Sequence, residues 1–384
     1  MQKVVIIQRR LTHYRVPLFE RLRVLLHARN IDLRLIAGQG TQAENLKQDA
    51  GYLPWAEPLS TRYWAGDRKS VVGGRLCWQP LRPYLHDVDL LIVTQENKLL
   101  FNHLLVLMPR QYKLAFWGHG ANLQSDSPNG LKERFKRWST NRVDWWFAYT
   151  QMSAALIKTA GYSESNITVL NNAVDTEQLM KFRREVTLDE TSALRKVLGF
   201  DAGPVGIYVG SLYADKRLDF LFDAAKSIRE AVPDFHLLIV GEGAERDKVR
   251  AWCDTHAWCR WVGARFGRDK AACMSVADIM INPGGLGLGI LDSFVCEVPL
   301  ITISGGKHGP EIAYIENEVN GLITADGLKS YVDACVGLLH TPARLQQLRA
   351  GCAESARIYT MENMAQRFAD GIVRCLGTKR GKHT

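Results

Sequence analysis

The fold is decided by residues 282–311, which read NPGGLGLGILDSFVCEVPLITISGGKHGPE. An apolar run over residues 277–281 precedes the clustered glycines, and a second apolar run over residues 298–303 follows them. This order predicts a buried strand that ends in a glycine-rich turn and opens a helix. Such a turn gathers backbone N–H groups at one point, where the helix start also carries a partial positive charge. The stretch therefore predicts a loop that binds phosphate.

The chain has 384 residues, which is long enough for two domains with separate cores. No apolar run approaches the ~20 residues that a membrane-spanning helix needs. The start, MQKVVIIQRR, predicts a first strand and not a signal peptide, so we expect a cytoplasmic protein. The eight cysteines stand singly with no C-x-x-C pair, which favours buried thiols in a reducing compartment over a zinc site.

The excess positive charge lies in the first half of the chain. Residues 1–185 hold 26 Lys and Arg against 16 Asp and Glu, whereas the remainder holds 23 against 24. This asymmetry indicates that the first half faces a polyanion or an anionic membrane surface. A solvated basic face is the alternative.

Short runs rich in Val and Ile alternate with amphipathic stretches along the whole chain. Strands are predicted in the first half at 4–7, 33–36, 90–94, 114–117 and 146–149. The pattern restarts near residue 203, with strands predicted at 206–209, 235–240, 259–262, 279–281 and 300–303. This alternation predicts two α/β domains with parallel sheets. The expected domains are residues 1–175 and 204–360, joined by a linker at 176–203, and a terminal helix at about 361–376 is expected to pack back on the first domain.

Four stretches give the chain a resemblance to the GT-B glycosyltransferases, most closely glycosyltransferase family 4. In chain order they are Asn171-Asn172-Ala173-Val174-Asp175, Tyr208-Val209-Gly210-Ser211 with Lys216 behind it, Ile239-Val240-Gly241-Glu242-Gly243, and the opening stretch through Pro310-Glu311. The first half matches mainly by pattern, through Gly118-His119-Gly120. The resemblance implies two tandem Rossmann-like domains with a deep crevice between them. It also implies transfer of a sugar from a nucleotide-sugar donor.

The chain departs from the family pattern at functional positions. Of the family's E-x7-E pair, the second acid falls on Asp292 and the first on Gly284. Ser211 stands where the family often has Arg, and Arg217 stands where it often has Gly. The glycine pair after the first strand is absent. The chain is therefore either an active enzyme with altered donor contacts or a non-catalytic paralogue. Four intact residues favour an active enzyme: His119, Lys216, Asp292 and Glu311.

The resemblance places the donor-binding residues in the second half. They are Gly210, Ser211, Lys216, Arg217, Gly284, Gly285, Leu286, Gly287, Asp292 and Glu311. Lys216 is expected to open a helix and to neutralise the leaving diphosphate, with Arg217 beside it. The glycines are expected to offer backbone N–H groups to the sugar and the diphosphate. Asp292 is expected to accept hydrogen bonds from the ribose hydroxyls, and Glu311 either contacts sugar hydroxyls or caps a helix. Each assignment has an alternative without a function. Lys216 could be a surface lysine, the glycines could form a tight loop that binds nothing, and Asp292 could face solvent.

The first half supplies one catalytic candidate and the acceptor-binding candidates. His119 follows the predicted strand 114–117 and would contact the donor sugar or accept a proton near the acceptor, although a lone histidine can also be structural. It completes the catalytic set with Lys216 and Asp292. The acceptor-binding candidates are His13, Tyr14 and Arg15, which follow the first strand. Arg9, Arg10 and Arg15 could meet an acceptor phosphate or the donor diphosphate, while packing or solubility would explain one or two of them.

The sequence thus predicts a hexosyltransferase that uses a nucleotide sugar, with UDP as the expected nucleotide. The expected acceptor is a glycan or a lipid-linked saccharide of cell-surface polysaccharide biosynthesis. The resemblance further implies retention of anomeric configuration without a metal or other cofactor. Asp87-Val88-Asp89 precedes a predicted strand and therefore predicts a turn and not a metal site.

Two questions stay open at the level of sequence. Residues 131–138 form either a core helix with a basic rim or a helix that lies on an anionic membrane, which would place the enzyme at the inner face of the membrane. The alternatives to a transferase are a non-catalytic nucleotide-sugar-binding scaffold and a GT-B sugar-nucleotide epimerase. We expect no nucleic-acid partner, because the aromatic residues do not interleave with the basic ones in any recognised module.

Overall fold

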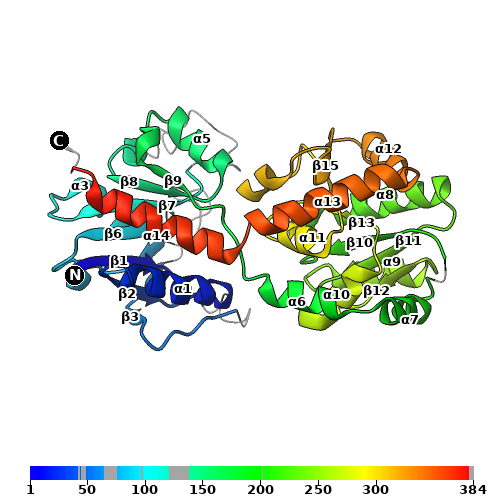
Figure 1. Ribbon diagram of the computed structural model, residues 1–384, viewed down its shortest axis with the longest axis horizontal. Helices are drawn as coiled ribbons and strands as arrows, with labels where there is room; N and C mark the ends of the chain where they lie inside the picture. Colours follow the sequence, from blue (N-terminus) through cyan, green and yellow to red (C-terminus); the bar gives the residue numbers. More distant parts are fainter. Residues whose placement is uncertain are drawn as a thin grey trace. The chain divides into compact units, whose positions relative to one another are not determined.

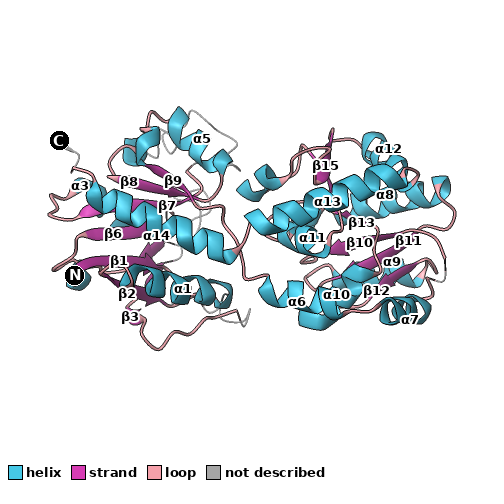
Figure 2. Ribbon diagram, in the orientation of Figure 1, coloured by secondary structure: helices cyan, strands magenta, loops and turns pink. Residues whose placement is uncertain are grey.

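A computed structural model describes residues 1–41, 44, 49–64, 76–96, 98–120, 138–200 and 202–379. It divides into two compact units, each with its own parallel sheet (Figures 1 and 2). Unit 1 comprises Met1–Asp175 and Met361–Thr384, and unit 2 comprises Thr176–Thr360. The prediction of an α/β fold with two Rossmann-like sheets is confirmed. Residues 131–137 of the proposed basic helix lie outside the described residues.

The sheet of unit 1 has seven parallel strands, in the order β3-β2-β1-β6-β7-β8-β9. Their bounds are β1 Gln2–Gln8, β2 Ile31–Gly38, β3 Glu57–Leu59, β6 Leu90–Thr94, β7 Lys113–Gly118, β8 Trp145–Ala148 and β9 Ile167–Val169. Continuous apolar runs form these strands because helices cover both faces of the sheet, so neither face needs polar side chains.

The helices of unit 1 come from both ends of the chain. They are α1 Val16–His27, α3 Leu100–Leu107, α5 Gln151–Thr159 and α14 Met361–Gly377, with 3-10 turns at η1 His13–Arg15, η2 Arg82–Tyr84 and η3 Glu164–Asn166. A small antiparallel pair, β4 Arg62–Trp64 and β5 Leu76–Trp78, lies beside the main sheet. The terminal helix α14 packs on α1 and against β8 and β9 (Figure 1). Phe368 anchors it, with its ring 5.0 Å from Trp117 and 4.5 Å from Phe147.

The sheet of unit 2 has six parallel strands, in the order β12-β11-β10-β13-β14-β15. Their bounds are β10 Val205–Val209, β11 His236–Val240, β12 Cys259–Trp261, β13 Ile279–Ile281, β14 Leu300–Ile303 and β15 Gly321–Thr324. The helices are α6 Glu177–Glu185, α7 Leu188–Leu198, α8 Leu218–Ala231, α9 Arg246–Asp254, α10 Gly267–Ser275, α11 Ile290–Cys296, α12 Leu328–Leu339 and α13 Pro342–Ile358. Two 3-10 turns complete the unit, η4 Ala214–Lys216 and η5 Pro310–Tyr314.

Each sheet reverses its direction of growth beside its first strand. In unit 2 the chain passes from β10 to β11 and β12 on one side, then returns to β13 on the other side of β10. In unit 1 it does the same between β1 and β6. The loops at the carboxyl ends of these strand pairs diverge, which is where open α/β sheets bind ligands. The fold therefore places a candidate site after β10 and β13, and a second after β1 and β6.

The segment 176–203 differs from the prediction, because it forms α6 and α7 within unit 2 and is not a linker. The helix α6 packs on α10 and α11, although Leu179 is its one buried residue. A capping box of Thr187 and Glu190 starts α7, and Gly199 ends it in a left-handed conformation with φ 75°. These helices are charged and carry few apolar residues, so their sequence pattern is typical of a linker.

All eight cysteines are buried and free, as their apolar surroundings predicted. Among the described residues, no helix is both long enough and apolar enough to cross a membrane.

Gly371 on α14 packs closely against the sheet of unit 1. A Cβ added there would stand 2.5 Å from Thr168 Oγ1 and 2.8 Å from the Phe147 ring. Alanine normally stabilises a helix interior by up to ~1 kcal/mol relative to glycine. We predict the reverse for Gly371→Ala, a loss of about 1–3 kcal/mol from overpacking. Urea unfolding measures this change.

Gly377→Ala on the same helix is the control, because no atom lies within 4 Å of its added Cβ. It should leave stability unchanged or raise it. Equal effects of the two substitutions would show that α14 does not depend on close packing at Gly371.

Candidate functional site

The loop after β13, residues 282–289, packs against the segment that follows β10. A Cβ added to Gly284 would stand 2.3 Å from the carbonyl carbon and oxygen of Lys216. The N–H of Gly285 donates to the Asp215 carbonyl at 3.0 Å, and Lys216 Nζ donates to the Gly285 carbonyl. Because the Lys216 backbone fills the space beside residue 284, this chain has no room there for the family's first acid.

His308 holds this loop from the other side. Its Nε2 donates to the Ile303 carbonyl at 2.8 Å, and its Nδ1 accepts the N–H of Leu286 at 3.2 Å. The N–H of Gly309 donates to the Leu286 carbonyl at 2.6 Å. Both ring bonds require the neutral imidazole with its proton on Nε2. Burial and the nearby Lys216 ammonium lower the pKa of His308, against the hydrogen bond to Ile303, which raises it.

Of the four predicted donor amides in the loop, those of Gly284, Gly285 and Leu286 are bonded within the protein, and that of Gly287 is not bonded to any of the described residues. The N–H of Gly284 donates to Asn282 Oδ1 at 3.2 Å, and the next two amides are also bonded within the protein. In the described part of the chain, no acceptor engages the amides of residues 287–289. No atom lies within 4 Å of a Cβ added to Gly287 or Gly289. The N–H groups available to a phosphate are therefore those of 287–289.

A cavity of about 320 Å³ opens at the ends of β10 and β11. Three predicted donor-binding residues line it, Gly210, Ser211 and Asp292. Asp292 Oδ1 pairs with Lys270 Nζ at 2.8 Å, with the two side chains only 15% and 22% exposed. Phe266, which is 79% exposed, lies at the same cavity.

Sequence reasoning missed Lys270 and Phe266. The available signal was the predicted strand at 259–262, because the helix after a parallel strand starts at the ligand-binding edge of the sheet.

Lys216 does not open a helix, contrary to the sequence-based expectation. It ends the 3-10 turn η4, and α8 starts at Leu218. Between them Arg217 adopts a left-handed conformation, with φ 54° and ψ 48°. This conformation costs a non-glycine residue roughly 1–2 kcal/mol, which explains the family's preference for glycine here.

Arg217 and Glu311 do not line the cavity, and neither do Lys216 and the predicted residues of the loop after β13. The Arg217 guanidinium bonds to Asp326 Oδ1 at 2.8 Å and lies 4.6 Å from the centre of the Phe220 ring. Glu311 is 4% exposed and lies in η5, with its carboxylate close to Gly309. The Gly309 N–H bonds to the Leu286 carbonyl, so Glu311 lies close to the loop after β13.

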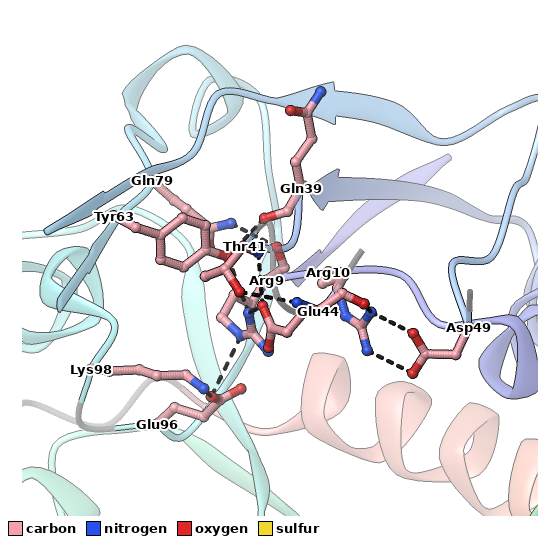
Figure 3. Close-up of polar contacts among 10 residues, drawn as sticks. All are labelled: Arg9, Arg10, Gln39, Thr41, Glu44, Asp49, Tyr63, Gln79, Glu96 and Lys98. Carbon is pink, nitrogen blue, oxygen red and sulfur yellow. Dashed lines mark hydrogen bonds and ion pairs between the residues drawn. The ribbon is translucent and has the colours of Figure 1, made fainter. Parts of the chain in front are cut away.

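In unit 1, carboxylates hold two of the three arginines that follow β1 (Figure 3). Arg9 forms two hydrogen bonds with Glu44, at 2.7 and 2.9 Å, and lies 3.8 Å from Glu96. Arg10 forms two hydrogen bonds with Asp49, at 2.6 and 2.8 Å. The Arg9 guanidinium lowers the pKa of Glu44 to about 2. Arg9 and Arg10 are therefore paired cations, which argues against phosphate contact by either of them.

The predicted acceptor residues and His119 share one cluster around Tyr149. The buried Arg15 donates from Nη2 to the Tyr149 hydroxyl at 3.2 Å, and its guanidinium lies 4.5 Å from the centre of the Trp117 ring. His119 is exposed and contacts the Tyr149 ring edge-on, with 4.5 Å between the ring centres. His13 contacts Tyr14 in the same manner, with 6.2 Å between the ring centres. The carboxyl ends of β1, β7 and β8 bring these residues together.

Asp87 and Asp89 stand at the opposite, amino-terminal edge of the sheet. Asp87 has a positive φ of 57° and pairs with the Lys3 ammonium, while Asp89 accepts the Lys3 N–H at 2.7 Å. These bonds fix the turn before β6. The described residues contain no group of three or more His, Cys, Asp or Glu side chains placed to hold a metal ion.

Residues 203–341 match the family model of "Glycosyl transferases group 1". Over 267 residues the chain is 28% identical to a GDP-mannose-dependent monoacylated alpha-(1-6)-phosphatidylinositol monomannoside mannosyltransferase from Corynebacterium glutamicum. That match covers 66% of this chain and 68% of the relative. A phosphatidyl-myo-inositol mannosyltransferase from Mycobacterium leprae is 25% identical over 189 residues, which cover 48% of this chain and 50% of that protein.

The fold is similar to that of the Anabaena protein HepE in complex with UDP, with a TM-score of 0.68 and 16% identity over 97% of this chain and 100% of the other. It is also similar to that of WaaG, a glycosyltransferase involved in lipopolysaccharide biosynthesis, with a TM-score of 0.61 and 13% identity over 96% and 98%. These structures define the GT-B fold. The chain carries a glycosyl transferase group 1 domain on this fold and is a glycosyltransferase.

Gly284→Ala should destabilise the protein by about 1–3 kcal/mol, because the new methyl group meets the Lys216 backbone and not a movable side chain. Gly287→Ala is the matched control in the same loop and should change stability by less than about 0.5 kcal/mol. Urea unfolding of both variants checks this. A Gly284→Ala protein as stable as the wild type would contradict the close approach.

Stability should fall below about pH 6.5 through His308. The folded state holds this pKa below its usual 6.5, so the unfolded chain takes up the proton first as the pH falls. The difference in unfolding free energy between wild type and His308→Gln should therefore shrink from pH 7.5 to pH 5.5. Exposed His340→Gln in the same unit should show no such trend. If the difference in unfolding free energy between wild type and His308→Gln stayed constant, the neutral imidazole of His308 would not be needed to hold the loop.

Proposed function

We propose that this protein transfers a hexose from a nucleoside-diphosphate sugar to a glycan or lipid-linked saccharide. The observation that carries the proposal is the meeting of Lys216 with the loop after β13, inside the segment that matches the family model. Breaking the sugar–phosphate bond builds negative charge on the leaving diphosphate. A fixed ammonium and free amides at that point lower the barrier, and the loss of one such donor typically costs 10²–10³ in rate.

We assign three roles in donor binding. The Lys216 ammonium and the amides of 287–289 neutralise the diphosphate. Asp292 accepts hydrogen bonds from the ribose hydroxyls, and Lys270 holds that carboxylate in place at 2.8 Å. Phe266, exposed at the cavity, stacks on the nucleobase. Gly210 and Ser211 form the wall beside the ribose.

The proposed donor nucleotide is UDP, as the sequence-based prediction has it. GDP is the alternative, supported by the name of the C. glutamicum relative. We propose that transfer retains the anomeric configuration and needs no metal. In this scheme His119 lies at the sugar–acceptor end of the reaction, next to the cluster of His13, Tyr14 and Arg15.

We place the acceptor on a lipid carrier at the inner face of the membrane. The names of the C. glutamicum and M. leprae relatives specify phosphatidylinositol-based acceptors. The surplus of basic residues in the first half supports an anionic surface as the place of reaction. Synthesis of a cell-surface glycan is the pathway that we propose.

Thermal unfolding with UDP, GDP and ADP tests the donor site. A nucleotide at ~100 times its Kd should add about 2.7 kcal/mol to stability. Lys216→Ala and Asp292→Asn should lose this gain. Lys216→Ala should also lower transfer from the matching nucleotide sugar by about 10²-fold or more. If the nucleotide stabilised both variants as much as the wild type, Lys216 and Asp292 would have no role in donor binding.

The exposed pair Lys329 and Asp333 of the same unit provides matched controls. Lys329→Ala and Asp333→Asn make the same chemical changes on the surface and should keep the full nucleotide shift. Stabilisation by a nucleotide, with no turnover of any of its sugars, would instead favour the non-catalytic nucleotide-sugar-binding scaffold. Interconversion of a free nucleotide sugar, with no transfer to any acceptor, would favour the epimerase.

A further inference from the structure

Arg15 stands apart from the other two arginines that follow β1. Arg9 and Arg10 each have a carboxylate partner, as Figure 3 shows. Arg15 is more deeply buried than either, at 7% exposure, yet within the described ranges no hydrogen bond or ion pair joins it to a carboxylate. The fold thus buries one cation of the three without a counter-charge.

A buried cation with no anion is costly and therefore needs an explanation. The guanidinium stays protonated in proteins, so it cannot reduce the cost by losing its charge. The rings of Tyr14, Trp117 and Tyr149 lie 4.5–5.5 Å from it and offset part of the cost by cation–π attraction. Nη2 has the Tyr149 hydroxyl as its acceptor, but Nη1 is buried and meets no hydrogen-bond acceptor among the residues that the structure describes.

The position of Arg15 is that of a ligand-binding residue. It follows β1 at the point where the sheet of unit 1 reverses its direction of growth. It shares Tyr149 with His119, whose side chain is exposed, so the cluster reaches the surface. The helix α1 starts at the next residue with no acidic side chain in its first turn, and its partial positive charge adds to that of the guanidinium.

We propose that Arg15 forms an oxyanion subsite in unit 1, which binds a phosphate or carboxylate group of the acceptor. Such groups are the natural partners of guanidinium, because they accept its hydrogen bonds and supply the missing charge. The inference rests on the proposed function and narrows the acceptor to an anionic saccharide or a phosphate-linked one. The aromatic rings hold the guanidinium ready, so little ordering is needed on binding.

The test measures binding of glucose 6-phosphate, glucuronate and glucose to the full chain by saturation-transfer NMR. Saturating UDP or GDP fills the donor site first, so that the phosphate probe cannot bind there. The wild type should bind at least one charged sugar about tenfold more tightly than glucose. The phosphate and carboxylate probes show which oxyanion the subsite prefers. Equal binding of all three sugars would overturn the proposal.

Single substitutions test whether Arg15 causes the preference for charged sugars. Arg15→Met should abolish the preference for charged sugars, and Arg15→Lys should retain part of it. Arg23→Gln removes the same charge from the exposed face of α1 and should keep the full preference. An unchanged preference in Arg15→Met, or an equal loss in Arg23→Gln, would overturn the proposal.

The donor diphosphate is the other possible source of an oxyanion. If it were the ligand, Arg15→Met would weaken nucleotide binding about tenfold, which would also overturn the assignment to the acceptor. We expect a change of less than twofold. If Arg15→Met does not fold, the wild-type comparison and Arg15→Lys decide the question.

Failure of the proposed function has a different signature. In that case no nucleotide stabilises the protein, while titration of charged sugars without nucleotide still shows a preference that depends on Arg15.

Discussion

The candidate site of unit 2 depends on one steric constraint, the contact of residue 284 with the backbone of Lys216. Only glycine fits, because any Cβ would overlap a carbonyl group that cannot move aside. This contact lets the loop after β13 close on the segment after β10. The hydrogen bonds that Gly285 and Lys216 donate, and the one that His308 accepts, accompany it. At the position of the family's first acid, the chain thus has a close approach of two backbones, which leaves no room for a longer side chain.

Much of this architecture could be predicted from the sequence, because buried parallel strands leave continuous apolar runs. The predicted bounds of β6, β13 and β14 coincide with those observed. Contacts between distant residues could not be predicted. The carboxylates that pair with Arg9 and Arg10 come 35 and 39 residues later, and Lys270 precedes Asp292 by 22. Such pairs depend on how loops and helices turn about the sheet edge, for which local periodicity carries no information.

Most of the charges described at the two candidate sites are paired within the protein. In unit 2 the Asp292 carboxylate is held by Lys270, so a ligand meets a compensated pair with its geometry already set. In unit 1, Arg9 and Arg10 are paired with Glu44 and Asp49, so these two cations add little to the positive field of that half. The number of basic residues in a segment therefore overstates the field that a partner meets, and a single buried arginine can matter more than several paired ones.

The position of α14 in the chain has a consequence for synthesis. Unit 1 is assembled from two segments, and the 185 residues of unit 2 lie between them. At roughly 5–20 residues per second, the ribosome needs about 10–40 s to pass from the first segment to the second. During that interval Trp117 and Phe147 lack the Phe368 ring that covers them in the finished unit. The continuous second unit can therefore mature before the first unit receives its final helix.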